Sequence, residues 1–466
     1  MNRFLRKGLL SLLATFRNIT GIACILTCIG VTNAAVLGPE VQIIAPGYKN
    51  PDIFWAHADP MDRRYMLVCM QRQELTGDID ASLYRSSDSG GTWQKTIVDR
   101  STTAVAEESC DYGRDGRAYF TTGTWIVRMA GGKATDTPDW FHLFRSNDHG
   151  LTWSKPIHRG FVDWTLVTAD RASGERSNRV YVFGHLEFTH PLMRESSPVP
   201  ILLASQDGGR TFTEPVSPAP HGFQYVQGYP GGAAVLDDGT VVAGYALARM
   251  PTRYHGPVDF STLAKVRDVH NTIELMASHD AGKTLRSIAI VHDAYTNLTG
   301  FPSLAVDTSG HRFHGRLYLA WTEWNDNAAK MYIASSDDRG KTWQNHVMLT
   351  GSPWDSTGSS YRNLSKAAGA HLGDPSLAVN IDGTLGMLWS ENGGTSICFA
   401  VSRDGGKTFV DRTTLSTSGS STRTASLKKY NTPNVSLAAD AAGLFHAFWT
   451  QPGPGGLWTR SVTITR

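Results

Sequence analysis

Residues 86–93 read Ser-Ser-Asp-Ser-Gly-Gly-Thr-Trp, and five further segments of the chain follow the same pattern. The pattern is Ser-x-Asp-x-Gly-x-Thr followed by an aromatic residue, which Leu285 replaces in one copy. Asp and Ser side chains bond nearby backbone N–H groups, Gly supplies positive φ, and the aromatic residue opens a strand. The pattern therefore predicts six hairpin turns. The other copies begin at Ser146, Ser205, Ser278, Ser336 and Ser402.

The spacing of these turns predicts the architecture. Their aspartates are 58 to 73 residues apart, a period that indicates a propeller or a solenoid. Two strand patterns precede each turn, most clearly at 302–321 and 375–389, and a seventh pair at 433–450 is followed by a single strand at 457–464. The strand pattern at 41–45 can complete this last unit. We therefore predict one all-β domain, a propeller of seven four-stranded blades closed by its N-terminal strand; a six-bladed ring is the alternative.

The N-terminal segment differs from the repeats. It carries four basic and no acidic residues, an apolar run at 22–31, and the small residues Ala34 and Ala35. This order is typical of a secretory signal, and the run is short for a membrane span, so an uncleaved anchor is the alternative. We expect residues 1–35 to be the signal peptide and residues 36–466 the propeller. We also expect no membrane span after cleavage and a secreted or periplasmic protein.

Charge and cysteine content narrow the function further. The chain has 44 Lys+Arg and 42 Asp+Glu, a net charge of +2, and without residues 1–35 this becomes 2 − 4 = −2, which argues against nucleic acid as a partner. Cys69, Cys110 and Cys398 allow one disulfide and one thiol. We expect a monomer that has no cofactor. We also expect no metal site, because no Cys/His spacing typical of a zinc site is present. A structural Ca²⁺ is compatible with the carboxylate-rich loops, although no calcium motif is present.

Candidate site residues collect on the propeller face opposite the hairpin turns, where inter-blade loops surround a central depression. Aromatic rings stack on sugar faces and arginine forks hold carboxylates, so this mixture predicts a glycan or polysaccharide partner. For each of these residues taken alone, the alternative is a purely structural role, either as a solvated loop residue or as a buried polar residue whose hydrogen bonds are satisfied. On this face we expect Asp78, Asp80, His185 and Tyr229, together with the candidate substrate-contacting residues Lys49, Arg72, Arg249, Arg253, Glu323, Trp324 and Asp374.

The eight-residue repeat is the Asp box, and over most of residues 41–466 the chain is similar to the sialidase (BNR-repeat) superfamily of β-propellers. The resemblance implies an exo-acting, sialidase-type glycosidase that hydrolyses terminal acidic sugars, with the Asp boxes as structural turns. It implies Arg72 as a substrate-positioning cation and Asp78 or Asp80 as the general acid/base. Lys49 stands where the family carries an arginine, and Asp374 stands where its nucleophilic tyrosine precedes Ser-x-Leu.

Two other functions fit the same residues. Some seven-bladed propellers related to this superfamily are polysaccharide lyases that use His, Tyr and Arg. Such β-elimination on a uronic-acid-containing polysaccharide needs an acid/base pair and a cation beside the substrate carboxylate, and His185, Tyr229 and Arg249 lie in adjacent predicted blades. A non-catalytic glycan- or protein-binding propeller is the third reading. The sequence thus predicts a carbohydrate-active protein, with sialidase-type hydrolysis as the first hypothesis.

Overall fold

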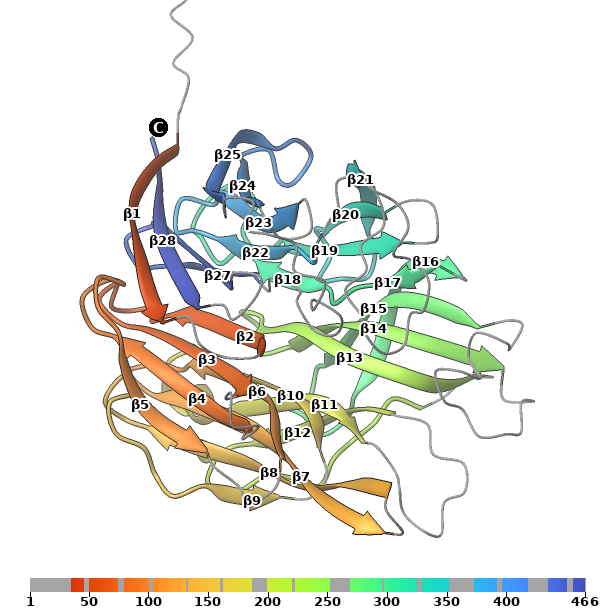
Figure 1. Cartoon of the computed structure of the whole chain (residues 1–466). Coiled ribbons are helices and arrows are strands. Elements are labelled where there is room, and N and C mark those ends of the chain that lie inside the picture. The colour runs from red at the N-terminus through yellow and green to blue at the C-terminus, as the bar shows by residue number, and fades with distance from the viewer. Residues whose placement is uncertain are drawn as a thin grey trace, which may run out of the picture. The chain divides into compact units, whose positions relative to one another are not determined.

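Seven antiparallel sheets make up the part of the chain that this computed structural model describes (Figure 1). We number these sheets blades 1 to 7 in chain order. The described residues are 35–465 without 46–49, 74–78, 100–103, 131–132, 160–161, 187–198, 220–222, 252–268, 296, 325–328, 352–372, 392–395, 418–434 and 451–455.

The first three blades form the N-terminal part of the propeller. Blade 1 consists of β2 (Asn50–Ala58), β3 (Met66–Gln73), β4 (Ile79–Ser86) and β5 (Gln94–Asp99). Blade 2 consists of β6 (Ala104–Tyr112), β7 (Ala118–Ala130), β8 (Lys133–Ser146) and β9 (Ile157–Arg159). Blade 3 consists of β10 (Asp163–Ala169), β11 (Val180–Leu186) and β12 (Val199–Ser205), with the 3₁₀ turn η1 (Gly174–Asn178) between its first two strands.

The other four blades complete the set. Blade 4 consists of β13 (Phe223–Val235), β14 (Val241–Pro251), β15 (His270–Ser278) and β16 (Arg286–Tyr295). Blade 5 consists of β17 (Leu298–Thr299), β18 (Ser303–Val306), β19 (Leu317–Trp324), β20 (Ala329–Ser336) and β21 (Gln344–Gly351). Blade 6 consists of β22 (Ser376–Val379), β23 (Leu385–Glu391), β24 (Ser396–Ser402) and β25 (Val410–Thr417). Blade 7 consists of β26 (Val435–Ala439), β27 (Phe445–Thr450), β28 (Leu457–Ile464) and β1 (Ala35–Ile44).

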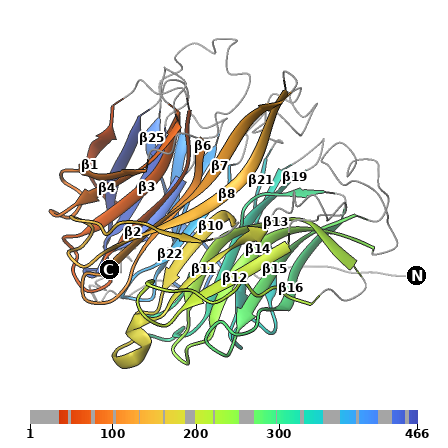
Figure 2. The ribbon, with the colours of Figure 1, turned by 90° about the horizontal axis from the view of Figure 1, so that it is seen from below.

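The inner strands of the blades form a closed ring. Each lies against the inner strand of the next blade, in the order β2, β6, β10, β13, β18, β22, β26 and back to β2. In Figure 2, seen from below, the inner strands β10 and β13 of two neighbouring blades lie next to each other. The ring confirms the seven-bladed prediction over the six-bladed alternative. Two blades depart from the expected four strands. In blade 3, an isolated bridge between Leu202 and Val216 stands in place of the fourth strand among the described residues. In blade 5, two short strands, β17 and β18, both pair with β19.

A repeated side-chain bond joins neighbouring inner strands. A serine near the start of one inner strand accepts a hydrogen bond from a backbone N–H of the next inner strand. Such bonds satisfy a buried donor that no sheet ladder reaches. The clearest cases are Ser303 to Leu377 at 2.9 Å, Ser376 to Leu437 at 2.9 Å, and Ser436 to Ala56 at 3.0 Å. The last of these bonds links the final blade to the first one.

The N-terminal strand closes the last blade, as predicted. In Figure 1, β1 (red) runs beside β28 (dark blue), and Ala35 pairs with Ile464. The strand begins at Ala35 rather than at 41. Gly38 and Pro39 break its pattern, and the register shifts between Leu37 and Glu40 at the same point. A Gly–Pro pair inside a strand reads as a turn, so this first half is not recognisable in the sequence.

The Asp boxes form the predicted turns. In the fifth box, Asp338 accepts hydrogen bonds from the Ser336 hydroxyl at 2.8 Å, the Thr342 N–H at 2.9 Å and the Thr342 hydroxyl at 2.6 Å. These bonds favour the ionised carboxyl and lower the pKa of Asp338 to about 2. Gly340 supplies φ +85, and a Cβ there would collide with Leu275 of the preceding blade. The boxes are therefore structural turns that also position neighbouring blades.

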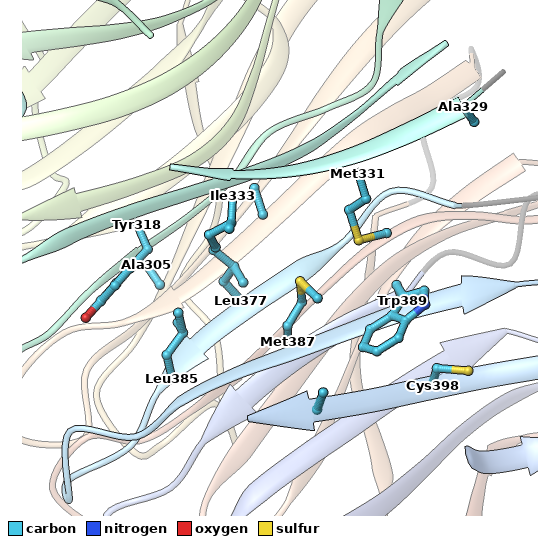
Figure 3. Packing of buried hydrophobic residues seen from close by; sticks show 12 residues of the cluster. Ala305, Tyr318, Ala329, Met331, Ile333, Leu377, Leu385, Met387, Trp389 and Cys398 are labelled. Atoms are coloured by element: carbon cyan, nitrogen blue, oxygen red, sulfur yellow. The ribbon is translucent and has the colours of Figure 1, made fainter. Parts of the chain in front are cut away.

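The hydrophobic core lies between the blades rather than within one sheet. Between blades 5 and 6, Met331 and Met387 face each other and Trp389 lies near the free Cys398 (Figure 3). Between blades 1 and 2, a disulfide joins Cys69 to Cys110, which resolves the pairing that the sequence left open. No helix among the described residues is long and apolar enough to cross a membrane.

Candidate functional site

Five side chains from four adjacent blades form one contact group, most of them near the start of an inner strand. We call this group the mouth. It comprises Trp164 in β10, His185 in β11, Tyr229 in β13, Phe301 before β18, and Asp374 before β22. The contacts described below connect every member to at least one other.

Three aromatic rings form one wall of the mouth. Trp164 stacks on Phe301 with ring centroids 4.9 Å apart and planes at 27°. Tyr229 meets both rings edge-on, with centroids 4.7 Å from Trp164 and 5.4 Å from Phe301. All three residues remain partly exposed. The rings therefore offer apolar surface to a ligand instead of being sealed in the core.

Local sequence brings these rings together. Beyond Tyr229, the strand continues as Pro230, Gly231 and Gly232. A Cβ on Gly231 would collide with the carbonyl oxygen of Pro302, and one on Gly232 would lie 2.6 Å from the backbone nitrogen of Leu304. Only glycine permits this approach of β13 to β18. The approach places Tyr229 beside Phe301.

Trp164 has an unusual backbone. Its φ is +54°, in the left-handed region that a bulky residue rarely adopts. The register of β10 against β11 is interrupted between Asp163 and Leu166, so Trp164 lies in a bulge of the strand. Bulges re-aim side chains, and strained backbone concentrates at functional sites. The ring of Trp164 is thus directed to the wall at a conformational cost.

His185 and Tyr229 are the polar pair of the mouth. Their ring centroids lie 5.4 Å apart with planes at 78°. His185 lies near the end of β11, opposite Asp163, and is 1% exposed, whereas Tyr229 is partly exposed. An imidazole and a phenol at this separation are two groups that can hold and transfer protons in one site. The structure therefore brings together two of the four predicted catalytic residues.

Asp374 supplies the carboxyl of the mouth. It accepts a hydrogen bond from the Phe301 N–H at 3.4 Å, and a Cβ on Gly300 would collide with its carboxyl oxygens. Burial raises the pKa of Asp374 to about 7, and the Phe301 N–H opposes that rise only in part. A carboxyl whose pKa is near neutrality can give or take a proton at working pH.

Arg249 forms a second polar group between blades 3 and 4. Its Nε lies 3.0 Å from Oε1 of Glu274, and its guanidinium stacks on Phe223 at 3.5 Å. Glu274 is fully buried and also accepts hydrogen bonds from Thr272 at 2.9 Å and Ser287 at 2.5 Å. Burial outweighs these partners and raises the pKa of Glu274. Arg249 thus already has a carboxylate partner, which orients its fork.

Tyr225 lies next to this ion pair. It is 3% exposed, and burial together with the charge of Glu274 raises its pKa, which Arg249 opposes. Its phenol therefore stays protonated at neutral pH. Tyr225 joins the buried cluster between blades 3 and 4, so its role is to pack and hydrogen-bond rather than to ionise.

The remaining predicted residues lie elsewhere or outside the description. Asp80 is buried in β4 and accepts the Ser82 hydroxyl at 2.9 Å. Glu323 lies between blades 4 and 5, where His292 and Asn297 each bond it at 2.5 Å; burial opposes ionisation, but these bonds prevail and lower its pKa. Lys49, Asp78 and Arg253 lie outside the described residues, as do the side chains of Arg72 and Trp324. Among the described residues, no group of three His, Cys, Asp or Glu side chains is arranged to hold a metal.

Sequence reasoning missed part of the site. Trp164 directly follows Asp163 at the start of a predicted inner strand, and that position was its only signal. Phe223 and Tyr225 belong to an aromatic stretch that ends at Tyr229. Glu274 sits in the middle of a third strand and has no signal in the sequence, because its partner Arg249 comes from another strand.

Comparison with known proteins supports the fold. No protein-family model matches the sequence, and a search of curated proteins gives no significant match. Among solved structures, the chain is similar to a protein of unknown function from Dyadobacter fermentans, with TM-score 0.50 and 12% identity over 93% of this chain and 100% of that one. It is also similar to a PL25 ulvan lyase, with TM-score 0.50 and 12% identity over 90% of this chain and 95% of that one.

A third similar structure is the Hadza microbial sialidase Hz136, with TM-score 0.43 and 14% identity over 91% of this chain and 94% of that one. At these identities the likeness concerns the fold alone, and the sialidase match is too weak to add to it. The class defined by fold and site is therefore a seven-bladed β-propeller with an aromatic-lined, titratable mouth.

Proposed function

We propose that this protein is a carbohydrate-active propeller that cleaves a uronic-acid-containing polysaccharide by β-elimination. The observation that carries the proposal is the His185–Tyr229 pair, 5.4 Å apart in a mouth walled by aromatic rings. Elimination from a uronate needs one group to remove a proton α to the carboxylate and another to protonate the leaving oxygen. This pair supplies one of each, beside surface suited to a sugar ring.

In the proposed step, neutral His185 removes the proton on C5 of the uronate. The electron pair of that C–H bond forms a C4=C5 double bond, and the bond from C4 to the glycosidic oxygen breaks. Tyr229 donates its phenolic proton to the departing oxygen. The His185 proton then passes through solvent and restores the phenol, so the step needs no oxidant, reductant or water as reactant.

The same step requires a cation to stabilise the charge that spreads onto the carboxylate. Arg249 belongs to the blade that carries Tyr229 and lies near the end of β14. It contacts Glu274 through Nε, so the outer fork of its guanidinium is the part that would engage a substrate carboxylate. The buried Glu274 would then position Arg249 rather than react.

A second candidate is sialidase-type hydrolysis, which one observation favours. Asp374, with its pKa near 7, is suited to donate a proton to a glycosidic oxygen. Hydrolysis and elimination differ in their products, because elimination creates a C=C bond that absorbs in the ultraviolet and hydrolysis does not.

The test is to incubate the purified protein with uronate polysaccharides and with a fluorogenic sialoside. The expected result is rising ultraviolet absorbance with the polysaccharides, abolished by His185→Ala and reduced at least about a hundredfold by Tyr229→Phe. The chain offers a matched control, His270 and Tyr295, an edge-on pair 4.8 Å apart outside the mouth. His270→Ala and Tyr295→Phe should leave the rate unchanged. Release of fluorophore without new absorbance would support hydrolysis instead.

We propose in addition that the protein works outside the cytoplasm, in a secreted or periplasmic location. Its support is the Cys69–Cys110 disulfide, a bond that persists in oxidising compartments.

A further inference from the structure

The aromatic wall contains side chains that the elimination step does not use. Trp164, Tyr229 and Phe301 come from three consecutive blades and all remain partly exposed. Tyr229 has a proposed proton to donate, but Trp164 and Phe301 have no titratable group. Their stacked rings, 4.9 Å apart, extend the mouth sideways from the His185–Tyr229 pair.

Trp164 is held in place against its own backbone preference. At φ +54°, a glycine would be relaxed and a bulky side chain is strained. A residue kept in such a conformation needs a reason in the surrounding structure or in a ligand. Trp164 contacts Phe301 and Tyr229 and is partly exposed, so part of its surface can also contact a ligand.

Asp374 fixes the chemistry of that partner. Its carboxyl contacts the backbone of Phe301 at the edge of the wall. Among the described residues, no Lys, Arg or His forms an ion pair with Asp374. Where Asp374 is ionised, above its pKa of about 7, it would repel a sugar carboxylate placed here, whereas a sugar hydroxyl could donate to it.

We propose that Trp164, Phe301 and Tyr229 stack the apolar face of an uncharged sugar next to the cleaved uronate, with Asp374 accepting one of its hydroxyls. The position next to the uronate rests on the proposed elimination. The substrate class that follows is a polysaccharide in which uronates are separated by neutral sugars, rather than a polymer of uronates alone.

The first test compares polymers. Hyaluronan and gellan carry neutral sugars between their uronates, whereas polygalacturonate and alginate carry a carboxylate on every residue. The expected result is cleavage of at least one of the first pair at about ten times or more the rate of either member of the second pair. Faster cleavage of polygalacturonate or alginate would overturn the inference and leave the proposed elimination intact.

The second test uses Trp164→Gly, which removes the ring and suits the backbone. Tyr295→Gly is the matched control, because Tyr295 is also an aromatic residue in the left-handed region, at φ +51°, and lies outside the mouth. Binding of neutral-sugar oligosaccharides from gellan is measured by calorimetry, with thermal unfolding beside it. We expect Trp164→Gly to weaken binding about tenfold without lowering the melting temperature, and Tyr295→Gly to leave binding unchanged.

The outcomes separate the two proposals. Unchanged oligosaccharide binding in folded Trp164→Gly contradicts the stacking role, whether or not the protein eliminates. Binding that depends on Trp164, in a protein that produces no ultraviolet-absorbing product from any polymer, supports the stacking role and refutes the elimination.

Discussion

Replacing Asp374 by Asn should stabilise the protein increasingly as pH rises above about 4, with the full effect above about pH 7. Burial raises the pKa of Asp374 from 3.8 to about 7, so the folded chain holds this proton where the unfolded chain has lost it. Stability therefore falls as pH rises from about 4 to about 7, and the loss is complete above the folded pKa. The difference, 7 − 3.8, is about 3 pH units and corresponds to about 4 kcal/mol as an upper limit.

Partial exposure of Asp374 reduces that limit, because solvent screens the charged form. We expect Asp374→Asn to be about 1–3 kcal/mol more stable than the wild type near pH 9 and nearly equal to it near pH 4. The assay is urea unfolding of both proteins at several pH values across this range. A stability difference that does not change with pH, or an Asn variant that is less stable at pH 9, would refute the reasoning about burial.

Asp338→Asn is the matched control with the opposite sign. Hydrogen bonds in the Asp box lower the pKa of Asp338 to about 2, so its contribution is present above the unfolded pKa and is lost as pH falls toward 2. This variant should be less stable than the wild type at neutral pH, and the difference should shrink in acid. The pH dependence of stability should therefore have opposite signs for the two variants, because Asp374 is a buried carboxyl and Asp338 is a hydrogen-bonded turn carboxyl.

Two other predictions concern ring closure and the disulfide. Ser436→Ala removes the 3.0 Å hydrogen bond from the Ala56 N–H that joins the last blade to the first, and should lower the free energy of unfolding by about 1–2 kcal/mol in urea titrations. Ser461→Ala, on the outer part of the same blade, is the control. Equal effects of the two substitutions would contradict a special role for the bond that closes the ring. Replacing both Cys69 and Cys110 by Ala removes a disulfide that spans 41 residues, and should lower the free energy of unfolding by about 2–4 kcal/mol. The free energy of unfolding of the wild type is measured with and without reductant. A wild type that reductant does not destabilise would contradict this prediction.

Local sequence sufficed for much of the fold. The turn at Ser86–Trp93 and its copies depend on residues within eight positions, so their chemistry is visible in the sequence. The strand from Ala35 was seen only from residue 41, because Gly38 and Pro39 imitate a turn. The reduced fourth strand of blade 3 was likewise not foreseen.

The site was predictable only in part, because its chemistry depends on distant residues. His185 and Tyr229 follow from their places in the predicted strand pattern, but the burial that raises the pKa of Asp374 comes from residues distant in the chain, such as Gly300, whose lack of a side chain leaves room for the carboxyl. The left-handed backbone of Trp164 could not be predicted from the sequence, because positive φ is expected mainly at glycine and not at a bulky residue. The signal peptide at 1–35, the monomeric state and the Ca²⁺ site stay predictions.

Cleavage in water labelled with heavy oxygen tests the central proposal most directly. The protein is incubated with a uronate polysaccharide that it degrades, and the product masses are measured. Elimination at the His185–Tyr229 pair takes no oxygen from water, so the expected product ends are unlabelled, carry a C=C bond and are one water lighter than a hydrolysis product. Products that carry the heavy oxygen and lack the double bond would contradict it.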